Sequence, residues 1–215
     1  MLASDKQVAA LVGLFKGGTR LTYKRGEFVI RPGEAQSAVF YIETGLVKAY
    51  NISKYGEENL LIIRKEHEIF PLIWAITGQE REIIYQAMAP TVVWRISPQQ
   101  YLTFLHNHPA ALPPLLDMVT EMYRIHSERL LNLEYRTVRE RLISFLITMS
   151  NRFGRETEAG VVIEVPLRHQ DIASSINASR ETASREISAL ERKELITNKD
   201  SFIVLKDVPK LQSYL

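Results

Sequence analysis

The segment from Arg168 to Ile196, RHQDIASSINASRETASREISALERKELI, constrains the fold of this chain more than any other. Ile172 and Ile176 are spaced four residues apart, which predicts a short helix with one apolar face. Asn177 then interrupts the apolar run, and asparagine tolerates the left-handed backbone that a tight turn between helices needs. Ser179 is a good N-cap for a second helix. The segment therefore predicts two short helices joined by a tight turn.

The second helix is expected over residues 179–191, with Ala183, Ile187 and Leu190 on its buried face. Four side chains near its start fall off that face, namely Arg180, Glu181, Ser184 and Arg185. The second helix of a helix-turn-helix presents such positions to the major groove of DNA. Arginine can donate two hydrogen bonds to guanine, and glutamate can accept one from cytosine. These four residues are the candidates for reading bases.

A second set of polar residues lies at predicted helix N-termini or at the tip of a predicted hairpin. These residues are expected to contact DNA phosphates and to fix the register of binding, and they are Arg168, His169, Ser179, Thr182 and Lys199. A single arginine on a helix more often lies on a solvated face. The joint placement of several such residues after one turn favours a DNA surface instead.

The length of 215 residues is sufficient for two modest domains, each with its own core. The chain contains no cysteine, which excludes disulfides, thiol redox switches and cysteine-ligated iron–sulfur clusters. The sequence has neither an apolar run of membrane-spanning length nor a secretory signal at its start, so a cytoplasmic protein without a membrane partner is expected. The net charge of +2 does not identify a partner.

Residues 19–97 alternate short apolar runs with turn signals, which is typical of a small antiparallel barrel or roll. Glycines are expected at its strand ends or hairpin turns, where positive φ is accessible to them, at Gly26, Gly33, Gly45 and Gly56. Residues 1–18 suggest a short amphipathic helix that ends at Gly17 and Gly18. Together these patterns predict a β domain with one flanking helix.

A long helix is predicted from Pro109 to Tyr135, and it has two apolar stripes. One stripe has heptad spacing and consists of Leu112, Leu116, Val119, Tyr123, His126, Leu130 and Leu133. The other consists of Leu115, Met118, Met122 and Ile125. Two stripes need two partners, and the simplest assignment is the β domain for one and the same helix of a second copy for the other. The alternative is a helix buried on both sides within one chain.

The remainder of the chain predicts a compact helical domain with a hairpin. A hinge near Tyr135 and Arg136 precedes a helix over residues 137–150, a polar loop over 151–160 and a strand over 161–165. After the two helices, residues 195–205 form a hairpin whose tip would be the wing of a winged helix. The predicted class is α+β, with a β-roll over residues 1–108, a dimerisation helix and hinge over 109–135, and a winged helix-turn-helix over 136–215.

The motif SRETASR at residues 179–185 resembles the recognition helix of the CRP/FNR family of bacterial transcription regulators. The glycine pattern of residues 19–97 resembles the cyclic-nucleotide-binding roll of that family. The resemblance implies a homodimer that binds palindromic DNA with TGTGA-like half-sites and acts with RNA polymerase. It assigns Arg180, Glu181 and Arg185 to base reading. Glu186 departs from the family pattern, which more often has an apolar side chain there.

The ligand motifs of the family are altered in this chain. Cyclic-nucleotide binders resembling it have Gly-Glu for the ribose and Arg-Ser for the phosphate, whereas this chain has Pro71-Leu72 and Arg81-Glu82. A carboxylate beside the phosphate repels the ligand, and Pro71 lacks a backbone donor. Cyclic AMP is therefore not expected. Haem is not expected either, because Pro71 and Ile73 stand where the carbon-monoxide-sensing type has its ligands, and no metal set is predicted.

The candidates for lining an effector pocket are Phe70, Leu72, Ile73, Trp74, Arg81, Ile83, Tyr85 and Arg124. Either an apolar or 2-oxoglutarate-like effector binds there, or these residues fill the roll and no effector binds. Ile83 stands where the 2-oxoglutarate-sensing branch has a second arginine. A rival function is a ligand-sensing module in which DNA binding is secondary. The sequence contains no nucleophile elbow or phosphate loop, so an enzyme is not predicted.

Overall fold

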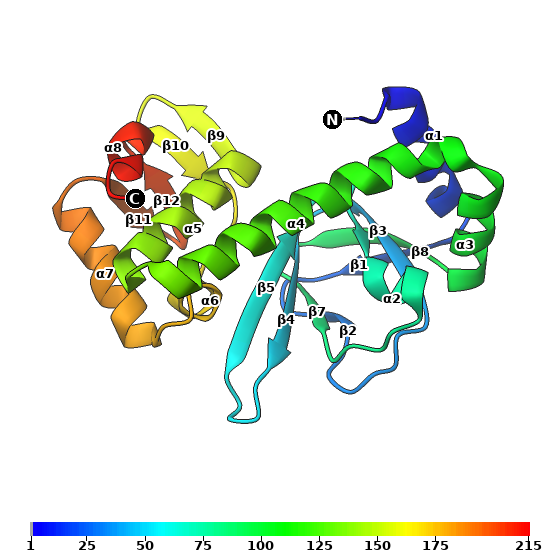
Figure 1. Cartoon of the computed structure of the whole chain (residues 1–215), viewed down its shortest axis with the longest axis horizontal. Helices are drawn as coiled ribbons and strands as arrows, with labels where there is room; N and C mark the ends of the chain where they lie inside the picture. The colour runs from blue at the N-terminus through cyan, green and yellow to red at the C-terminus, as the bar shows by residue number, and fades with distance from the viewer. Residues whose placement is uncertain (1) are drawn as a thin grey trace. The chain divides into compact units, whose positions relative to one another are not determined.

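The computed structural model describes residues 2–215, and the chain divides into two compact units (Figure 1). The first unit contains the residues up to Asn51 together with Leu61–Tyr123. The second contains Ile52–Leu60 and Arg124–Leu215. The long helix α4, Leu112–Tyr135, contributes residues to both units.

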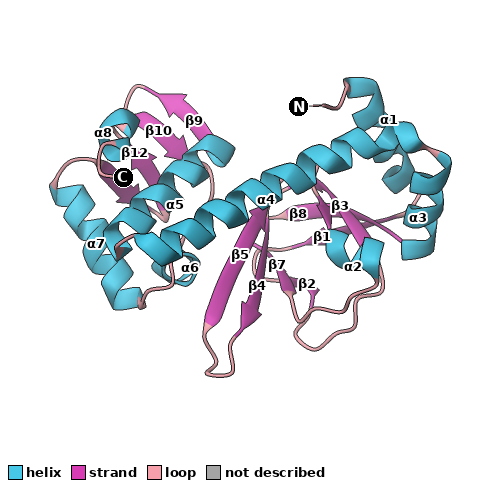
Figure 2. Cartoon of the chain, viewed as in Figure 1, coloured by secondary structure: helices cyan, strands magenta, loops and turns pink. Residues whose placement is uncertain are grey.

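The first unit is built on an antiparallel β-roll, as the alternating sequence predicted, and short helices flank the roll (Figure 2). The strands of the roll are β1 Thr19–Tyr23, β2 Phe28–Ile30, β3 Val39–Thr44, β4 Val47–Ile52, β5 Glu58–Arg64, β6 Ile69–Phe70, β7 Ile84–Ala87 and β8 Thr91–Ile96. The last residue of β4 and the first three of β5 fall in the second unit. One sheet has the order β1-β8-β3-β6 and the other the order β2-β7-β4-β5. The helices are α1 Asp5–Lys16, α2 Leu72–Thr77 and α3 Pro98–Asn107.

The four glycines that were predicted to take positive φ in the turns of the roll all do so. Gly45, between β3 and β4, shows why a side chain is excluded. Its φ is +98°, and a Cβ atom there would lie 2.6 Å from the carbonyl oxygen of Pro90. A residue with a side chain would therefore strain this hairpin and push β8 away.

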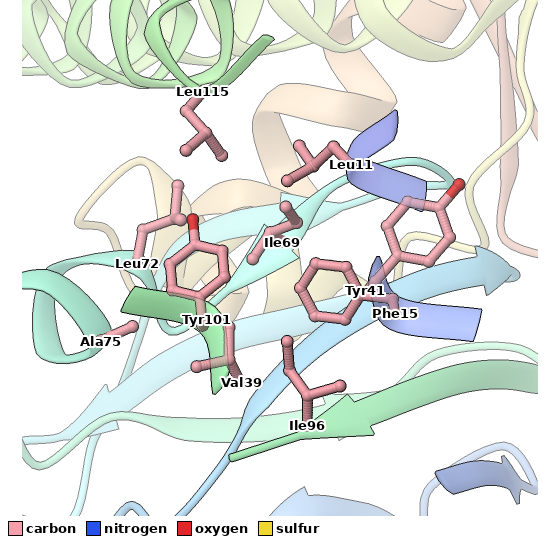
Figure 3. Close-up of a cluster of buried hydrophobic side chains, with 10 residues drawn as sticks. All are labelled: Leu11, Phe15, Val39, Tyr41, Ile69, Leu72, Ala75, Ile96, Tyr101 and Leu115. Carbon is pink, nitrogen blue, oxygen red and sulfur yellow. The ribbon is translucent and has the colours of Figure 1, made fainter. Parts of the chain in front are cut away.

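The core of the first unit lies between the β1-β8-β3-β6 sheet and the helices, and Figure 3 shows its buried side chains. Leu11 and Phe15 come from α1, and the ring of Phe15 stacks on Tyr41 with 5.5 Å between centroids. Tyr101 from α3 and Leu115 from α4 complete the cluster. The spacing of four between Leu11 and Phe15 explains why α1 buries one face here.

Helix α2 was not predicted, because the sequence of residues 19–97 suggested only strands. It follows β6 directly and ends at Gly78, which adopts the left-handed conformation and donates its N–H to the carbonyl of Trp74. Glycine at this position closes a helix readily. With only six residues, α2 is too short for apolar periodicity to distinguish it from a strand.

The second unit contains a three-helix core with a four-stranded sheet and a short last helix. Its elements are α5 Val138–Phe153, β9 Gly154–Thr157, β10 Gly160–Ile163, α6 His169–Ser175, α7 Arg180–Arg192, β11 Ile196–Lys199, β12 Phe202–Leu205 and α8 Val208–Gln212. The sheet order is β11-β12-β10-β9. The winged helix-turn-helix predicted from sequence is thus confirmed.

The prediction of a polar loop over residues 151–160 was wrong. Helix α5 continues to Phe153, and Gly154–Thr157 pairs antiparallel with Gly160–Ile163. Gly160 has a φ of +118°, which lets the chain turn within two residues. The strand β9 is an exposed edge strand with polar side chains, so its sequence lacks the apolar alternation by which a strand is predicted.

Among the described residues, no helix is both long and apolar enough to cross a membrane. Within residues 2–215 there is also no group of three or more His, Asp or Glu side chains that could hold a metal ion.

Candidate nucleic-acid interface

The turn between α6 and α7 has the geometry that its sequence predicted. Asn177 adopts φ +50°, in the left-handed region. The N–H of Ala178 donates to the carbonyl oxygen of Ala173 at 3.0 Å, which closes the end of α6. Asparagine suits this position because its short polar side chain tolerates positive φ. The turn therefore sets the direction in which α7 leaves α6.

Ser179 caps α7, as expected from the sequence. Its hydroxyl oxygen accepts a hydrogen bond from the N–H of Thr182 at 3.1 Å. Behind the cap, Ala183, Ile187 and Leu190 are almost fully buried, whereas the other side of the helix is polar. The first turn of α7 is therefore fixed both by its cap and by the core beneath it.

The predicted base-reading residues lie together on the outer side of α7. Arg180, Glu181 and Arg185 are exposed, and Ser184 is partly exposed. The pKa of the Glu181 carboxyl is lowered by a hydrogen bond from its own backbone N–H and by one from the Ser179 hydroxyl. The carboxylate therefore remains an ionised acceptor at neutral pH, which is the form that can accept from a cytosine amino group.

The wing lies beside the start of α6 and is tied to it by hydrogen bonds. The N–H of Leu167 donates to the carbonyl oxygen of Ser201 at 2.8 Å. Asn198 Nδ2, in β11, lies 3.1 Å from His169 Nε2 in the first turn of α6. The N–H of Arg168 donates to Asp171 Oδ2 at 3.1 Å and thereby caps α6. The wing and the first turn of α6 are thus held as one surface.

A polar depression of about 430 Å³ lies where α6, α7 and the wing meet. Its lining residues are Leu167, Arg168, His169, Gln170, Arg180, Asn198 and Ser201. Two arginines and several neutral donors in a concave surface suit an anionic oxygen such as a phosphate. Of the residues predicted to touch phosphate, Arg168 and His169 line this depression, whereas Ser179, Thr182 and Lys199 lie outside it.

Sequence reasoning missed Gln170, Asn198 and Ser201 as members of this surface. Gln170 directly follows His169, and its exposed position in the first turn of α6 was a usable signal. Asn198 and Ser201 reach the depression only through the pairing of the wing with α6, which is a tertiary contact. No local spacing in the sequence indicates this contact between the wing and α6.

The candidate effector residues differ in burial and in their surroundings. Phe70 and Tyr85 are buried and their rings stack with centroids 4.7 Å apart. Leu72 is 3% exposed and belongs to the core cluster of Figure 3, whereas Ile73 is 41% exposed. These two neighbours on α2 therefore face in different directions.

Trp74 and Arg124 have side-chain partners of their own, whereas Arg81 accepts a hydrogen bond through its backbone. Trp74 Nε1 donates to Glu80 Oε1 at 3.0 Å, and the Arg81 carbonyl accepts from Gln36 Nε2 at 3.1 Å. Ile83 is partly buried. Arg124 belongs to the second unit and forms an ion pair with Glu128 at 2.6 Å.

Much of the heptad stripe on α4 is exposed in the single chain. Tyr123 is 74% exposed and Leu116 is 53% exposed. Leu112, Val119, His126 and Leu130 are exposed as well, and Leu133 is partly buried. Leu115 of the second stripe is buried against the roll, and Met118 and Met122 pack beside it. The two stripes thus have different surroundings, as the sequence suggested.

The fold and the exposed polar face of α7 define the class: a DNA-binding protein in which a β-roll precedes a winged helix-turn-helix. Two family models match the chain. The cyclic nucleotide-binding domain matches residues 20–108, and the Crp-like helix-turn-helix domain matches residues 140–214. The chain belongs to the CRP/FNR family of transcription regulators.

Curated relatives include the global nitrogen regulator of Nostoc sp., which is 27% identical over 82% of this chain and 80% of its own length. The transcriptional activator protein Anr of Pseudomonas protegens is 25% identical, over 87% of this chain and 75% of its own length. By name, the first relative is a regulator and the second a transcriptional activator.

Two solved structures share the fold. A mutant of CooA from Carboxydothermus hydrogenoformans has a TM-score of 0.80 at 19% identity, over 99% of this chain and 97% of its own. The c-di-GMP responsive global regulator CLP of Xanthomonas campestris has a TM-score of 0.79 at 17% identity, over 93% of this chain and 99% of its own.

Proposed function

We propose that this DNA-binding transcription regulator reads a palindromic site as a homodimer through α7. The observation that carries the proposal is the placement of Arg180, Glu181 and Arg185 on one exposed face of a capped helix beside a depression that two arginines line. Arg180 and Arg185 would each donate to guanine, and Glu181 would accept from cytosine. Ser184, which has a shorter side chain, would contact a base from the same face. TGTGA-like half-sites suit this set.

The residues around the depression would hold the DNA backbone. Arg168 and His169 line it, and Lys199 lies at the wing tip. Ser179 and Thr182 lie at the N-terminus of α7, where backbone N–H groups favour phosphate. These contacts would set affinity and register with little dependence on sequence.

The exposed stripe on α4 supports the dimer. Leu112, Leu116, Val119, Tyr123 and Leu130 form an apolar row that water would otherwise cover. A second copy of α4 packed against this row would bury it, as heptad spacing allows. His126 and Leu133 complete the proposed interface. A two-fold dimer presents two recognition helices about 34 Å apart, which matches one turn of DNA.

For the first unit, we propose that any effector differs from cyclic AMP. The side chain of Leu72, where the resembled cyclic-nucleotide binders have a ribose-binding glutamate, is buried in the core cluster. Glu82 adds a negative charge next to Arg81. An effector would instead meet the aromatic pair Phe70 and Tyr85, with Arg81 and Ile83 nearby in the chain. The proposed role is regulatory and non-catalytic, in the cytoplasm and together with RNA polymerase.

The test is selection of duplexes from a random pool by the full chain, followed by gel shifts at several salt concentrations. The expected result is a palindrome whose half-sites are one helical turn apart, bound by a dimer with a steep salt dependence. Selection of an asymmetric half-site bound by a monomer would contradict the proposal. Addition of cyclic AMP is expected to leave the affinity unchanged.

A further inference from the structure

The first turn of α5 carries two arginines that contact the helix-turn-helix, one at α7 and one at the turn before α7. Arg139 Nε donates to Glu186 Oε2 of α7 at 2.7 Å, and Arg141 donates from one terminal nitrogen to the carbonyl oxygen of Asn177 at 3.2 Å. Neither Glu186 nor Asn177 was among the predicted base-reading residues. Both contacts come from a helix that precedes the DNA-reading segment.

The position of Arg139 near the start of α5 is unfavourable for a positively charged side chain. It is the second residue of α5, and the N-terminus of a helix carries a partial positive charge. Glu186 compensates for this with a carboxylate that is only 15% exposed, while the Arg139 side chain is 44% exposed. The pair joins residues 47 positions apart in the sequence. Glu186 therefore serves a tertiary contact at a position where the resembled family more often has an apolar residue.

One contact holds the turn before α7, and the other holds α7 itself. Asn177 lies in the turn before the helix, and Glu186 lies in its second turn, next to the buried Ile187. A rotation of α7 by about 10° would move side-chain atoms about 5 Å from its axis by about 1 Å. Hydrogen bonds to base edges weaken over such a displacement. The rotation of α7 thus matters for Arg180 and Arg185, which lie on its outer face.

We propose that Arg139 and Glu186 act as a positioning pair that sets the rotation of the recognition helix and thereby the sequence specificity of the protein. Arg141 assists by holding the turn at Asn177. Neither member of the pair needs to touch a base. This inference rests on the proposed reading of bases by α7.

The variant Glu186→Gln separates positioning from simple electrostatics. Loss of a negative charge near DNA would by itself strengthen binding to every duplex. Positioning predicts instead that the ratio of affinities for the selected palindrome and for a random duplex of equal length falls by about threefold or more. Arg139→Gln is expected to lower the same ratio. An unchanged ratio with stronger binding to both duplexes would overturn the proposal.

The charge-reversed double variant, Arg139→Glu with Glu186→Arg, is expected to recover part of the ratio that each reversal alone removes. If the affinity ratio of the double variant falls by as much as the product of the falls in the two single reversals, the proposal is overturned. Arg139→Lys keeps the ion pair and is expected to retain the ratio to within about twofold. This conservative variant tests the pair even where a reversal lowers the unfolding midpoint.

The matched control is Arg155→Gln, which removes an ion pair with Glu164 elsewhere in the same unit. It takes away the same charge as Arg139→Gln but should leave the ratio unchanged. An equal fall in both variants would overturn the proposal. If the wild-type chain selects no sequence, the proposed function fails; if it does select one and the pair variants keep its ratio, only the positioning role fails.

Discussion

The hydroxyl oxygen of Ser179 accepts a hydrogen bond from the backbone N–H of Thr182 at 3.1 Å, and this contact begins the helix that carries the base-reading side chains. A helix start leaves several N–H groups without partners, and a serine cap satisfies one of them. The same serine hydroxyl also helps to keep the Glu181 carboxylate ionised. Ser179 therefore contributes both to the stability of α7 and to the ionisation of Glu181.

Replacement of Ser179 by alanine is expected to destabilise the second unit by about 1 kcal/mol, because the cap is lost. The measurement is chemical denaturation followed by circular dichroism. Ser188→Ala, in the middle of the same helix, is the control and should change stability by less than about 0.5 kcal/mol. Equal effects of the two variants would mean that the cap does not stabilise α7.

Replacement of Arg180 and of Lys199 by alanine should produce different losses. Arg180→Ala should relax the preference at one guanine position, with a cost of about 1–3 kcal/mol on the selected site. Lys199→Ala should weaken binding to all duplexes alike and reduce the salt slope by about one. Gel shifts on selected and random duplexes across several salt concentrations measure both. Equal losses on the two duplexes for Arg180→Ala would contradict its base-reading role.

Introduction of a charge into the exposed stripe of α4 should prevent dimerisation. Leu116→Glu places a carboxylate in an apolar row that a partner helix would bury, and burial of an unpaired charge is costly. Analytical ultracentrifugation should then give a monomer. Thr120→Glu changes an exposed residue outside that row and should leave the dimer intact. A dimer that survives Leu116→Glu would place the interface elsewhere.

The sequence predicted those parts of the structure that local chemistry determines. Ala183, Ile187 and Leu190 are buried because their spacing keeps them on one face, and Asn177 turns the chain because its side chain permits positive φ. Helix α2 was not predicted because it is too short to show the periodicity of a helix. Strand β9 was not predicted because its polar residues show no apolar alternation. Asn198 at the depression and Arg139 behind α7 act through contacts with distant segments.

The cap at the start of α5 should make the second unit sensitive to acid. Glu140 Oε2 accepts hydrogen bonds from the Thr137 hydroxyl and the Thr137 N–H, both at 2.7 Å, and these lower the pKa of Glu140 below its usual 4.5. A carboxyl with a lowered folded pKa stabilises the fold above its unfolded pKa, and this contribution is lost as pH falls through the folded pKa. The stabilisation should therefore be present at neutral pH and be lost progressively as the pH falls below 4.5 and through the lowered folded pKa.

Comparison of wild type with Glu140→Gln measures this effect. The difference between their unfolding midpoints should be largest near pH 7 and should shrink as the pH falls below 4.5. Glutamine can still accept from Thr137, so the comparison reports mainly the charge. A difference that stays constant from pH 7 to pH 3 would show that ionisation of Glu140 does not contribute.

Tyr101 offers a test of the core of the first unit. Its side chain is fully buried, its hydroxyl oxygen has no hydrogen-bond partner among residues 2–215, and burial raises the pKa of the hydroxyl so that it stays neutral. An unpaired buried hydroxyl costs about 1–3 kcal/mol, so Tyr101→Phe should leave the unfolding midpoint unchanged or raise it. Tyr41→Phe is the matched comparison, because the Tyr41 hydroxyl lies 2.6 Å from His67 Nδ1. Loss of that hydrogen bond should lower the free energy of unfolding by about 1 kcal/mol, and the unfolding midpoint should fall with it. A larger loss for Tyr101→Phe than for Tyr41→Phe would mean that the Tyr101 hydroxyl has a stabilising partner in solution.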